Sequence, residues 1–213
     1  MKTLIINAHP DFTNIGDHYS LQLQQHFIKG VQEKYPNNEI TIFNLYQQEI
    51  PRLDCTDKGL FTAWNTEDTK NAQIISTQQT HQKLLSQFLS HHRVVITLPV
   101  HNFNIPSRLK DYLDNVMIAG KAFRYVHNGS VPLLTDDRKL IVLQASGSIY
   151  TQNDRYTNLD FSVQYLKEIF TNIMGFNSFE LVRAQGTSTS YWNEHSLKES
   201  FANLNKKMAE FYS

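Results

Sequence analysis

The amino-acid sequence predicts an α/β domain in which a five-stranded parallel sheet is covered by helices on both faces. Five short runs of apolar or alternating residues, each of strand length, are spread along the 213 residues. Between and after them lie five longer segments whose apolar residues recur at helical spacing. Because strands that alternate with helices form parallel sheets with right-handed crossovers, this pattern indicates a doubly wound arrangement.

The strands divide into central and edge strands by their hydropathy. Runs 4–6, 94–96 and 140–143 are continuously apolar, as expected for strands that are buried on both faces. Runs 39–43 and 178–181 partly alternate, which favours edge positions with one face less covered. With strands one, three and four in the centre, the predicted order is 2-1-3-4-5, that of a flavodoxin-like three-layer sandwich.

Five apolar stripes predict the helices between and after these strands. They consist of Tyr19, Leu23, Phe27 and Val31; Ile74, Leu84, Leu85 and Phe88; Leu109, Leu113, Val116 and Met117; Leu159, Val163, Leu166, Phe170 and Ile173; and Leu197, Phe201, Leu204, Met208 and Phe211.

Two stretches lie outside this alternation. Residues 45–68 are too many for a plain connection, so we expect a short helix and a surface excursion whose role the sequence leaves open. Residues 120–135 predict a small hairpin, because Asn128-Gly129 favours a tight primed turn. The chain shows no repeat, low-complexity tract or linker, and we expect residues 1–213 to form a single domain.

Composition excludes several classes of protein. Twenty basic residues balance twenty acidic ones, so the net charge favours neither nucleic acid nor an anionic membrane as a partner. Cys55 is the only cysteine, which excludes an intrachain disulfide and cysteine metal clusters and favours a reducing compartment, the cytoplasm. The apolar runs are far shorter than the ~20 residues that span a bilayer, and the N-terminus has no signal-like segment.

The loops after strands one, three and four are the expected place for a ligand, because the winding of the sheet reverses there. The first loop, 8–17, leads into a helix whose free N–H groups could bind a phosphate. It contains neither a P-loop nor a Gly-x-Gly-x-x-Gly fingerprint, which disfavours a nucleoside triphosphate and the dinucleotide fold with that fingerprint. His9 and Asn14 have an alternative interpretation as a turn residue and a helix N-cap.

The other two loops suit a planar heteroaromatic ligand. In loop 99–106, asparagine amides and main-chain groups can pair with a polar ring edge, while Phe103 or His101 covers the ring face. In loop 144–150, small residues allow close approach of the main chain, and Tyr150 adds a phenol. Both loops could also be ordinary connections, and His101 could be a solvated loop histidine.

Together the three loops resemble the FMN-dependent NADH:azoreductase and NAD(P)H quinone oxidoreductase family of the flavodoxin-like superfamily. Residues 99–105, 109–112, 119–120 and 123–125 look like those of the bacterial azoreductases. Ala8-His9-Pro10 resembles the opening of the quinone oxidoreductases. Residues 147–150 are similar to the Gly-Ser-x-Tyr turn of the animal quinone reductases. The resemblance covers nearly the whole chain.

The resemblance implies an enzyme that transfers hydride from NADH or NADPH through FMN, with FAD less favoured, to quinones or azo compounds. It also implies a homodimer with the flavin at the interface, in which Phe123 and Tyr125 of a partner roof the small aromatic acceptor. Tyr150 and His101 are the candidate proton donors, although either could be only a wall of the pocket. The implied cofactor-binding residues are His9, Ile15, Gly16, Asp17, Val100, His101, Asn102, Phe103, Ala145, Ser146, Gly147 and Ser148.

One departure from the family concerns the phosphate. Where azoreductases carry serines at the first helical turn, this chain has Ile15-Gly16-Asp17, which places a carboxylate near the expected phosphate. If Asp17 points to solvent, Gly16 and the N–H groups of the turn can still hold a phosphate. If Asp17 points inward, repulsion lowers FMN affinity, and the protein prefers FAD or binds no flavin.

Two other functions remain as alternatives. A flavodoxin-like electron-transfer protein would bind flavin without NAD(P)H turnover, although the hairpin around Phe123 disfavours a plain carrier. Hydrolysis would need paired carboxylates or a metal, and the nine scattered histidines predict no metal site.

Overall fold

The computed structural model describes residues 1–67 and 70–213. Its main sheet is parallel and has the order β2-β1-β3-β6-β7. Because β4 and β5 form a separate hairpin, this order confirms the predicted 2-1-3-4-5 arrangement. The strands of the main sheet are β1 Lys2–Asn7, β2 Glu39–Asn44, β3 Arg93–Pro99, β6 Lys139–Ser146 and β7 Ser178–Gln185.

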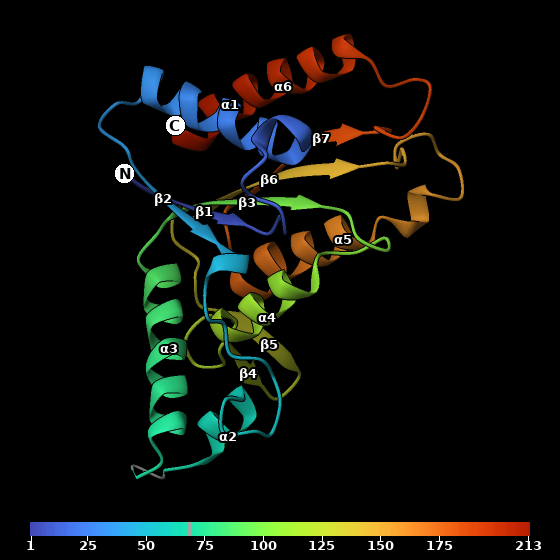
Figure 1. The fold of residues 1–213 in the computed structure, drawn as a ribbon. Coiled ribbons are helices and arrows are strands. Elements are labelled where there is room, and N and C mark those ends of the chain that lie inside the picture. The colour runs from blue at the N-terminus through green and yellow to red at the C-terminus, as the bar shows by residue number, and fades with distance from the viewer. Residues whose placement is uncertain (68–69) are drawn as a thin grey trace.

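Helices cover both faces of this sheet (Figure 1). Helices α1 and α6 lie on one face, and α3, α4 and α5 lie on the other. Helix α5 continues directly into a π-helical segment, Glu168–Met174. The helices are α1 Tyr19–Lys34, α2 Leu60–Asn65, α3 Ala72–Leu89, α4 Ser107–Val116, α5 Phe161–Lys167 and α6 Glu194–Tyr212.

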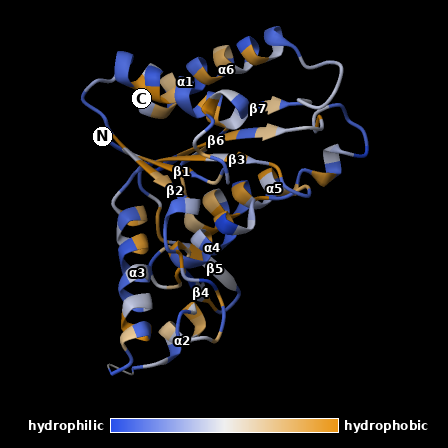
Figure 2. Cartoon of the chain, viewed as in Figure 1, coloured by the Kyte–Doolittle hydropathy of each residue, from blue (hydrophilic) through white to orange (hydrophobic). Residues whose placement is uncertain are grey.

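Burial follows the predicted division of the strands. β1, β3 and β6 are buried along nearly their whole length, whereas β2 contains no fully buried residue and β7 contains only two. Figure 2 shows the corresponding apolar colouring of the central strands. Phe27 anchors the core on the α1–α6 face, and Phe88 anchors the core under α3, α4 and α5. Each such fully buried side chain contributes about 1.5–3 kcal/mol.

The excursion after β2 contains the predicted short helix. A 3-10 turn spans Leu45–Gln47, and α2 follows and packs against α3. The last residue of the predicted stretch, Asp68, lies outside the described residues. Phe61 and Trp64 of α2 are largely exposed.

The predicted hairpin is present, but its turn differs from the prediction. β4 Phe123–Val126 pairs antiparallel with β5 Gly129–Pro132, with Val126 opposite Gly129. The two connecting residues are therefore His127 and Asn128, and neither has a positive φ angle. The prediction of a primed turn centred on Asn128-Gly129 was wrong, because Gly129 already belongs to β5.

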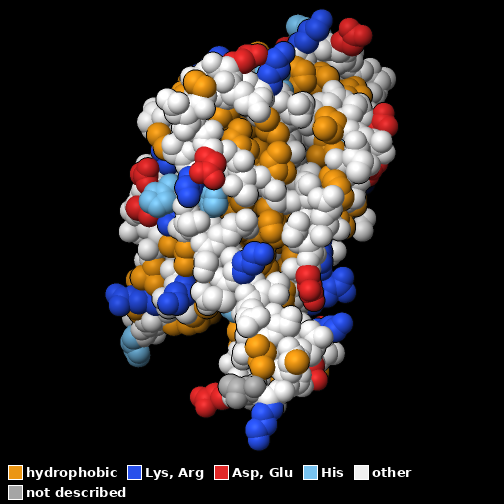
Figure 3. Space-filling view, turned by 60° about the vertical axis from the view of Figure 1, so that its left-hand side comes forward, with side chains coloured by type: hydrophobic (Ala, Val, Ile, Leu, Met, Phe, Trp, Pro, Cys, Tyr) orange, Lys and Arg blue, Asp and Glu red, His pale blue; other side chains and the backbone are white. Residues whose placement is uncertain are grey.

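On the face shown in Figure 3, Lys and Arg side chains are interspersed with Asp and Glu rather than gathered by sign. Among the described residues, no helix combines the length and apolarity that crossing a bilayer requires.

Candidate functional site

A cleft of about 290 Å³ lies at the carboxyl ends of β1, β3 and β6. It is the place where the winding of the sheet reverses. Seven of the predicted cofactor residues line it: His9, Asp17, Val100, His101, Ala145, Ser146 and Gly147. The other lining residues are His18, Tyr19, Ser20, Pro99 and Thr187.

Two histidines form one wall of the cleft, and Asp11 holds both. The rings of His9 and His18 lie 4.0 Å apart between centroids. Nδ1 of His9 lies 2.7 Å from the Asp11 main-chain oxygen, and Nε2 of His18 lies 3.0 Å from the Asp11 carboxylate. Each imidazole therefore has one nitrogen fixed by Asp11, and its second nitrogen has no hydrogen-bond partner among the described residues.

The charges in this wall are coupled. Burial lowers the pKa of His9, and the neighbouring His18 lowers it further. A hydrogen bond from His18, with others from Asn14 and Thr13, lowers the pKa of Asp11. Asp11 is thus a carboxylate beside His18, and the unliganded protein favours a neutral His9.

The N-terminus of α1 opens into the same cleft without a cap. Residues Ile15–Asp17 form a separate 3-10 turn, so the expected first helical turn in fact begins at Tyr19. His18 is the N-cap residue, but its side chain makes no capping hydrogen bond. Ser20, in the first turn, is 1% exposed, and its hydroxyl has no partner in the described part of the chain. Main-chain N–H groups and one orphaned hydroxyl therefore suit an anion.

Asp17 does not plug this cleft. Its side chain is exposed, and its main-chain N–H donates to the Asn14 oxygen at 3.1 Å. Gly16 has open space where a Cβ would stand. Ser20, in the first turn of α1, supplies a hydroxyl of the kind that Ile15-Gly16-Asp17 lacks.

A tight turn after β3 forms the second wall. The N–H of His101 donates to the Asn104 oxygen at 3.0 Å, and the N–H of Asn104 donates to the His101 oxygen at 2.9 Å. The two central residues, Asn102 and Phe103, both have positive φ angles, +47° and +65°. Asparagine tolerates this conformation, but for phenylalanine it is strained. The two reciprocal hydrogen bonds offset this strain and hold the turn, in which Phe103 is 41% exposed.

The loops after β6 and β7 form the third wall. The N–H of Thr187 donates to the Ser146 oxygen at 3.1 Å, and the N–H of Ser188 donates to the Gly147 oxygen at 3.3 Å. A Cβ at Gly147 would lie 2.8 Å from the Ser188 hydroxyl, so only glycine fits without a shift. This wall offers small, neutral groups to a ligand.

Three aromatic side chains, Phe103, Tyr156 and Tyr150, form a cluster in the loops that border the cleft. The rings of Phe103 and Tyr156 lie 6.3 Å apart, and Tyr150 meets Tyr156 edge-on at 6.4 Å. Tyr150 is 4% exposed and does not line the cleft, and burial raises the pKa of its phenol. Arg155 stacks on Tyr156 at 4.9 Å from the ring centroid.

The other predicted residues lie outside this cleft. Ile15, Gly16, Asn102, Phe103 and Ser148 belong to loops that border it but are not part of its lining.

The two hairpin residues lie farther along the chain and have opposite exposures. Phe123 packs in the core of its own chain, whereas Tyr125 is 75% exposed. Of this pair, Tyr125 is therefore the one that is free to reach another molecule.

Sequence reasoning missed three lining residues at the start of α1, His18, Tyr19 and Ser20, for which a signal existed, and Thr187, for which there was none. The apolar stripe of α1 begins at Tyr19, so His18 and Ser20 could have been assigned to the helix start. Thr187 follows the edge strand β7, and nothing in the sequence showed that its loop folds back over β6.

A larger hollow of about 580 Å³ lies along β7 and α6. Its one arginine, Arg183, is paired with Asp160, so its positive charge is already neutralised.

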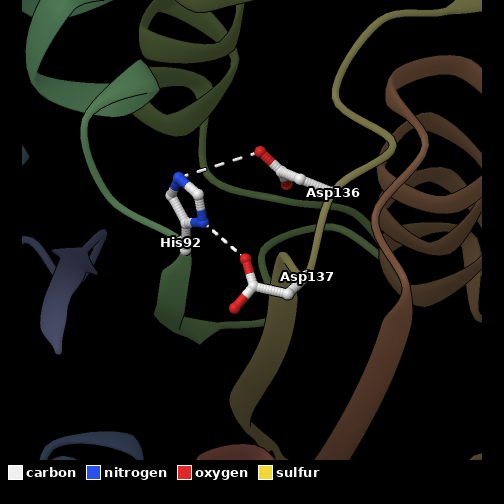
Figure 4. Close-up of side chains that lie close together, drawn as sticks. All are labelled: His92, Asp136 and Asp137. Atoms are coloured by element: carbon white, nitrogen blue, oxygen red, sulfur yellow. Dashed lines mark hydrogen bonds and ion pairs between the residues drawn. The ribbon is translucent and has the colours of Figure 1, made fainter.

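At the amino ends of β3 and β6, His92 lies between Asp136 and Asp137 (Figure 4). Their potential ligand atoms lie within 4.8 Å of one another. The prediction of no metal site did not foresee this grouping, because the three residues belong to distant segments of the sequence.

Comparisons with known proteins agree with this arrangement. A family model described as a flavodoxin-like fold matches residues 1–208. An FMN-dependent NADH:quinone oxidoreductase 1 of Lactiplantibacillus plantarum (strain ATCC BAA-793 / NCIMB 8826 / WCFS1) is 47% identical over 99% of each chain. One of Bacillus cereus (strain ATCC 10987 / NRS 248) is 45% identical over 91% of this chain and 90% of the relative.

A solved structure extends the likeness to three dimensions. The crystal structure of an FMN-dependent NADH-azoreductase from Bacillus anthracis str. Ames Ancestor, in complex with FMN, superposes with a TM-score of 0.92. It is 37% identical and covers 100% of this chain and 99% of that one. The resemblance inferred from the loops is confirmed, and the chain belongs to the flavodoxin-like family that contains the FMN-dependent NADH:quinone oxidoreductases.

Proposed function

We propose that the protein is a flavin-dependent oxidoreductase that uses NADH or NADPH to reduce quinones or azo compounds. The observation that carries this function is the uncapped N-terminus of α1, with the orphaned Ser20 hydroxyl, in a cleft at the reversal point of the sheet. Relatives that cover the whole chain are FMN-dependent NADH:quinone oxidoreductases. The donors in the cleft are of the kind that a phosphate ester requires.

The residues present fit FMN in preference to a larger flavin. The N–H groups of α1 and the hydroxyl of Ser20 would hold the phosphate. The cleft of about 290 Å³ is at the small end of ligand sites, which span about 300–1,000 Å³. The three-ring system would therefore extend beyond it, over the turn that carries Phe103. Gly147 leaves room for the ring edge.

FMN, when bound, supplies hydride transfer between reduced nicotinamide and an aromatic acceptor. The main-chain N–H groups of loop 146–148 would stabilise negative charge at the edge of the ring. Phe103 and Tyr156 would limit the acceptor to flat molecules and keep water away from one face. His101, in the cleft, is the better placed of the two candidate proton donors, because Tyr150 is buried behind Tyr156.

We also propose a homodimer, because the cleft covers only part of the flavin. Phe103, in the turn after β3, is exposed, Phe161 is exposed in a hollow that it shares with Asn104 and Ile105 of the same loop, and Tyr125 of the hairpin is 75% exposed. A second copy would place Tyr125 over the ring and complete the acceptor site. The single cysteine is consistent with a cytoplasmic location. Residues 1–213 would form one domain.

The test is a spectrum and a turnover assay on the purified protein. We expect a yellow protein that NADH or NADPH bleaches and that menadione recolours. A preparation that takes up neither FMN nor FAD contradicts the function. Flavin that binds without being reduced by either nicotinamide would instead support the electron-carrier alternative.

The dimer is tested separately by light scattering with Tyr125→Asp. The unaltered protein should have the mass of two chains, and the variant should shift towards one chain or lose quinone turnover while it keeps FMN. A monomeric unaltered protein with full turnover contradicts the dimer proposal.

A further inference from the structure

The cleft lacks the cations that usually accompany a phosphate. Loops 8–18, 100–106 and 186–193 contain no lysine or arginine, and loop 147–160 contains only Arg155. Arg155 stacks on Tyr156 and is not among the residues that line the cleft. A phosphate monoester carries a charge of about −1.5 to −2 at pH 7. Asp11 and Asp17 add two more negative charges near the place where it would bind.

The His9–His18 pair lies where a cation is needed. Both histidines line the cleft together with Ser20 and the start of α1. Asp11 fixes one nitrogen of each ring, and within residues 1–67 and 70–213 neither Nε2 of His9 nor Nδ1 of His18 has a hydrogen-bond partner. A protonated imidazole donates from both nitrogens, so His18 can keep its contact with Asp11 and still donate to a ligand.

Resting on the function proposed above, we propose that His18, supported by His9, binds the phosphate of FMN as an imidazolium. Binding of FMN then takes up a proton from solution. The positively charged ring takes the role that an arginine has in other phosphate sites. Together with the N–H groups of α1 and the Ser20 hydroxyl it forms one anion site.

The surroundings of the pair favour this proton uptake only when phosphate is present. In the free protein, burial and the neighbouring His18 lower the pKa of His9. The Asp11 carboxylate lies 3.0 Å from Nε2 of His18, and a bound phosphate would place a second anion beside the same ring. The β6 and β7 loops contribute only neutral lining groups. The titratable groups around the pair are Asp11, Asp17, Tyr19 and His101.

The experiment compares FMN with riboflavin, which has the same ring and ribityl chain but no phosphate. Dissociation constants are measured by flavin fluorescence at pH 7 and pH 8.5, where the phosphate, whose second pKa is about 6, is already dianionic. We expect FMN affinity to fall about tenfold over this range, because one bound proton is lost. Riboflavin affinity should change less than about twofold, because no proton is linked to its binding.

The variant His18→Gln keeps a polar side chain that cannot carry the proton. It should weaken FMN about tenfold at pH 7, reduce the pH effect to less than about threefold, and leave riboflavin unchanged. His26→Gln, a half-buried residue of α1 that contacts Phe201 and Asn205 of α6 and does not line the cleft, is the matched control and should bind both flavins like the unaltered protein. His18→Asn, which can also cap α1, is the second variant if circular dichroism shows that His18→Gln folds poorly.

Calorimetry in two buffers of different ionisation enthalpy counts the protons directly and should show uptake for FMN but not for riboflavin. Equal pH dependence for the two flavins, or an unchanged pH effect in His18→Gln, overturns the proposal. Failure of both flavins to bind instead contradicts the proposed function, so the two results are distinguishable.

Discussion

Histidines beside aspartates occur at both ends of the central strands, in the loop after β1 at the carboxyl end and before β3 and β6 at the amino end. At the carboxyl ends, His9 and His18 lie beside Asp11 with no arginine nearby, next to an uncapped helix N-terminus. At the amino ends, His92 lies between Asp136 and Asp137. Histidines that contact aspartates therefore do not by themselves mark a site.

What separates the two ends is the state of the helix termini and the charge balance. Arg138 donates to the carbonyls of Leu89 and His91 at 2.8 Å each, which satisfies the end of α3. Arg93 donates to the Phe211 oxygen in the last turn of α6 at 2.6 Å. These two guanidinium groups also balance Asp136 and Asp137, so the cluster has no excess negative charge to hold a cation.

The comparison teaches that the helix ends at the amino end have protein partners and the helix start at the carboxyl end does not. At the amino end, Arg93 and Arg138 donate to carbonyls at the ends of α6 and α3. At the carboxyl end, the first N–H groups of α1 and the Ser20 hydroxyl have no partner among the described residues. The first end is built for stability, and the second is built for a ligand.

Removal of Arg93 should have the largest effect. Arg93→Met leaves the Phe211 carbonyl without its donor and breaks a pairing with Asp137, and it should lower the free energy of unfolding by about 2–4 kcal/mol. Chemical denaturation measures the loss. Lys29→Met, which removes only the exposed pair with Glu33, should cost less than about 0.5 kcal/mol.

The division between the two ends also requires that Arg93→Met leave the cleft intact. Its FMN dissociation constant, measured on the folded fraction, should match that of the unaltered protein. A tenfold weaker affinity would show that the two ends are coupled and would break the comparison.

Removal of the Ser20 hydroxyl should have an intermediate effect. Unlike the Arg93 substitution, it should change FMN affinity and leave the free energy of unfolding unchanged. Ser20→Ala should weaken FMN about tenfold, because a hydrogen bond to a charged group contributes about 1.5–3 kcal/mol. The free energy of unfolding of the flavin-free protein should not fall, since the buried hydroxyl has no partner to lose. Calorimetry and denaturation measure the two quantities.

The control for Ser20 is a buried serine that has a partner. Ser162 accepts from the Gln144 side chain at 2.9 Å. Ser162→Ala should therefore lower the free energy of unfolding by about 1 kcal/mol and leave FMN affinity unchanged. A loss of stability in Ser20→Ala equal to that in Ser162→Ala would mean that the Ser20 hydroxyl is bonded in the free protein.

The main sheet could be predicted from the sequence because its signals are local. Continuous apolar runs belong to strands buried on both faces, and β1, β3 and β6 obey this rule along their length. The position of the cleft followed from strand order, since Val100 and Ala145 end neighbouring strands and must lie together. These steps needed no side-chain geometry.

The parts that could not be predicted depend on contacts between distant segments or on which residues occupy a turn. Whether residues 15–17 continue into α1 depends on where the chain bends, and the bend at His18 separates them. The turn of the hairpin lies one residue earlier than predicted, because Val126 pairs with Gly129 and leaves His127 and Asn128 as the connecting residues. The grouping of His92 with Asp137 joins residues 45 positions apart, which no local pattern reveals.

The smallest expected effect is that of substituting His92, which tests whether the contacts at the amino ends of β3 and β6 stabilise the protein in a pH-dependent way. The hydrogen bond from His92 lowers the pKa of Asp137. A carboxyl group whose folded pKa lies below its unfolded value of 3.8 stabilises the protein above that pH, and the stabilisation is lost as the pH falls through the folded pKa. Because Asp137 is largely exposed, His92→Gln should cost less than about 1 kcal/mol at pH 6.

That difference between His92→Gln and the unaltered protein should narrow as the pH falls below 3.8, and 1 M salt, with a Debye length of about 3 Å, should also reduce it. Urea denaturation at several pH values measures both effects. The cleft should respond in the same direction but at higher pH, since a lowered pKa of His9 makes the flavin-free protein lose stability as the pH falls through 6.5. A His92→Gln difference that persists unchanged into acid would show that the amino end is held by the arginines alone.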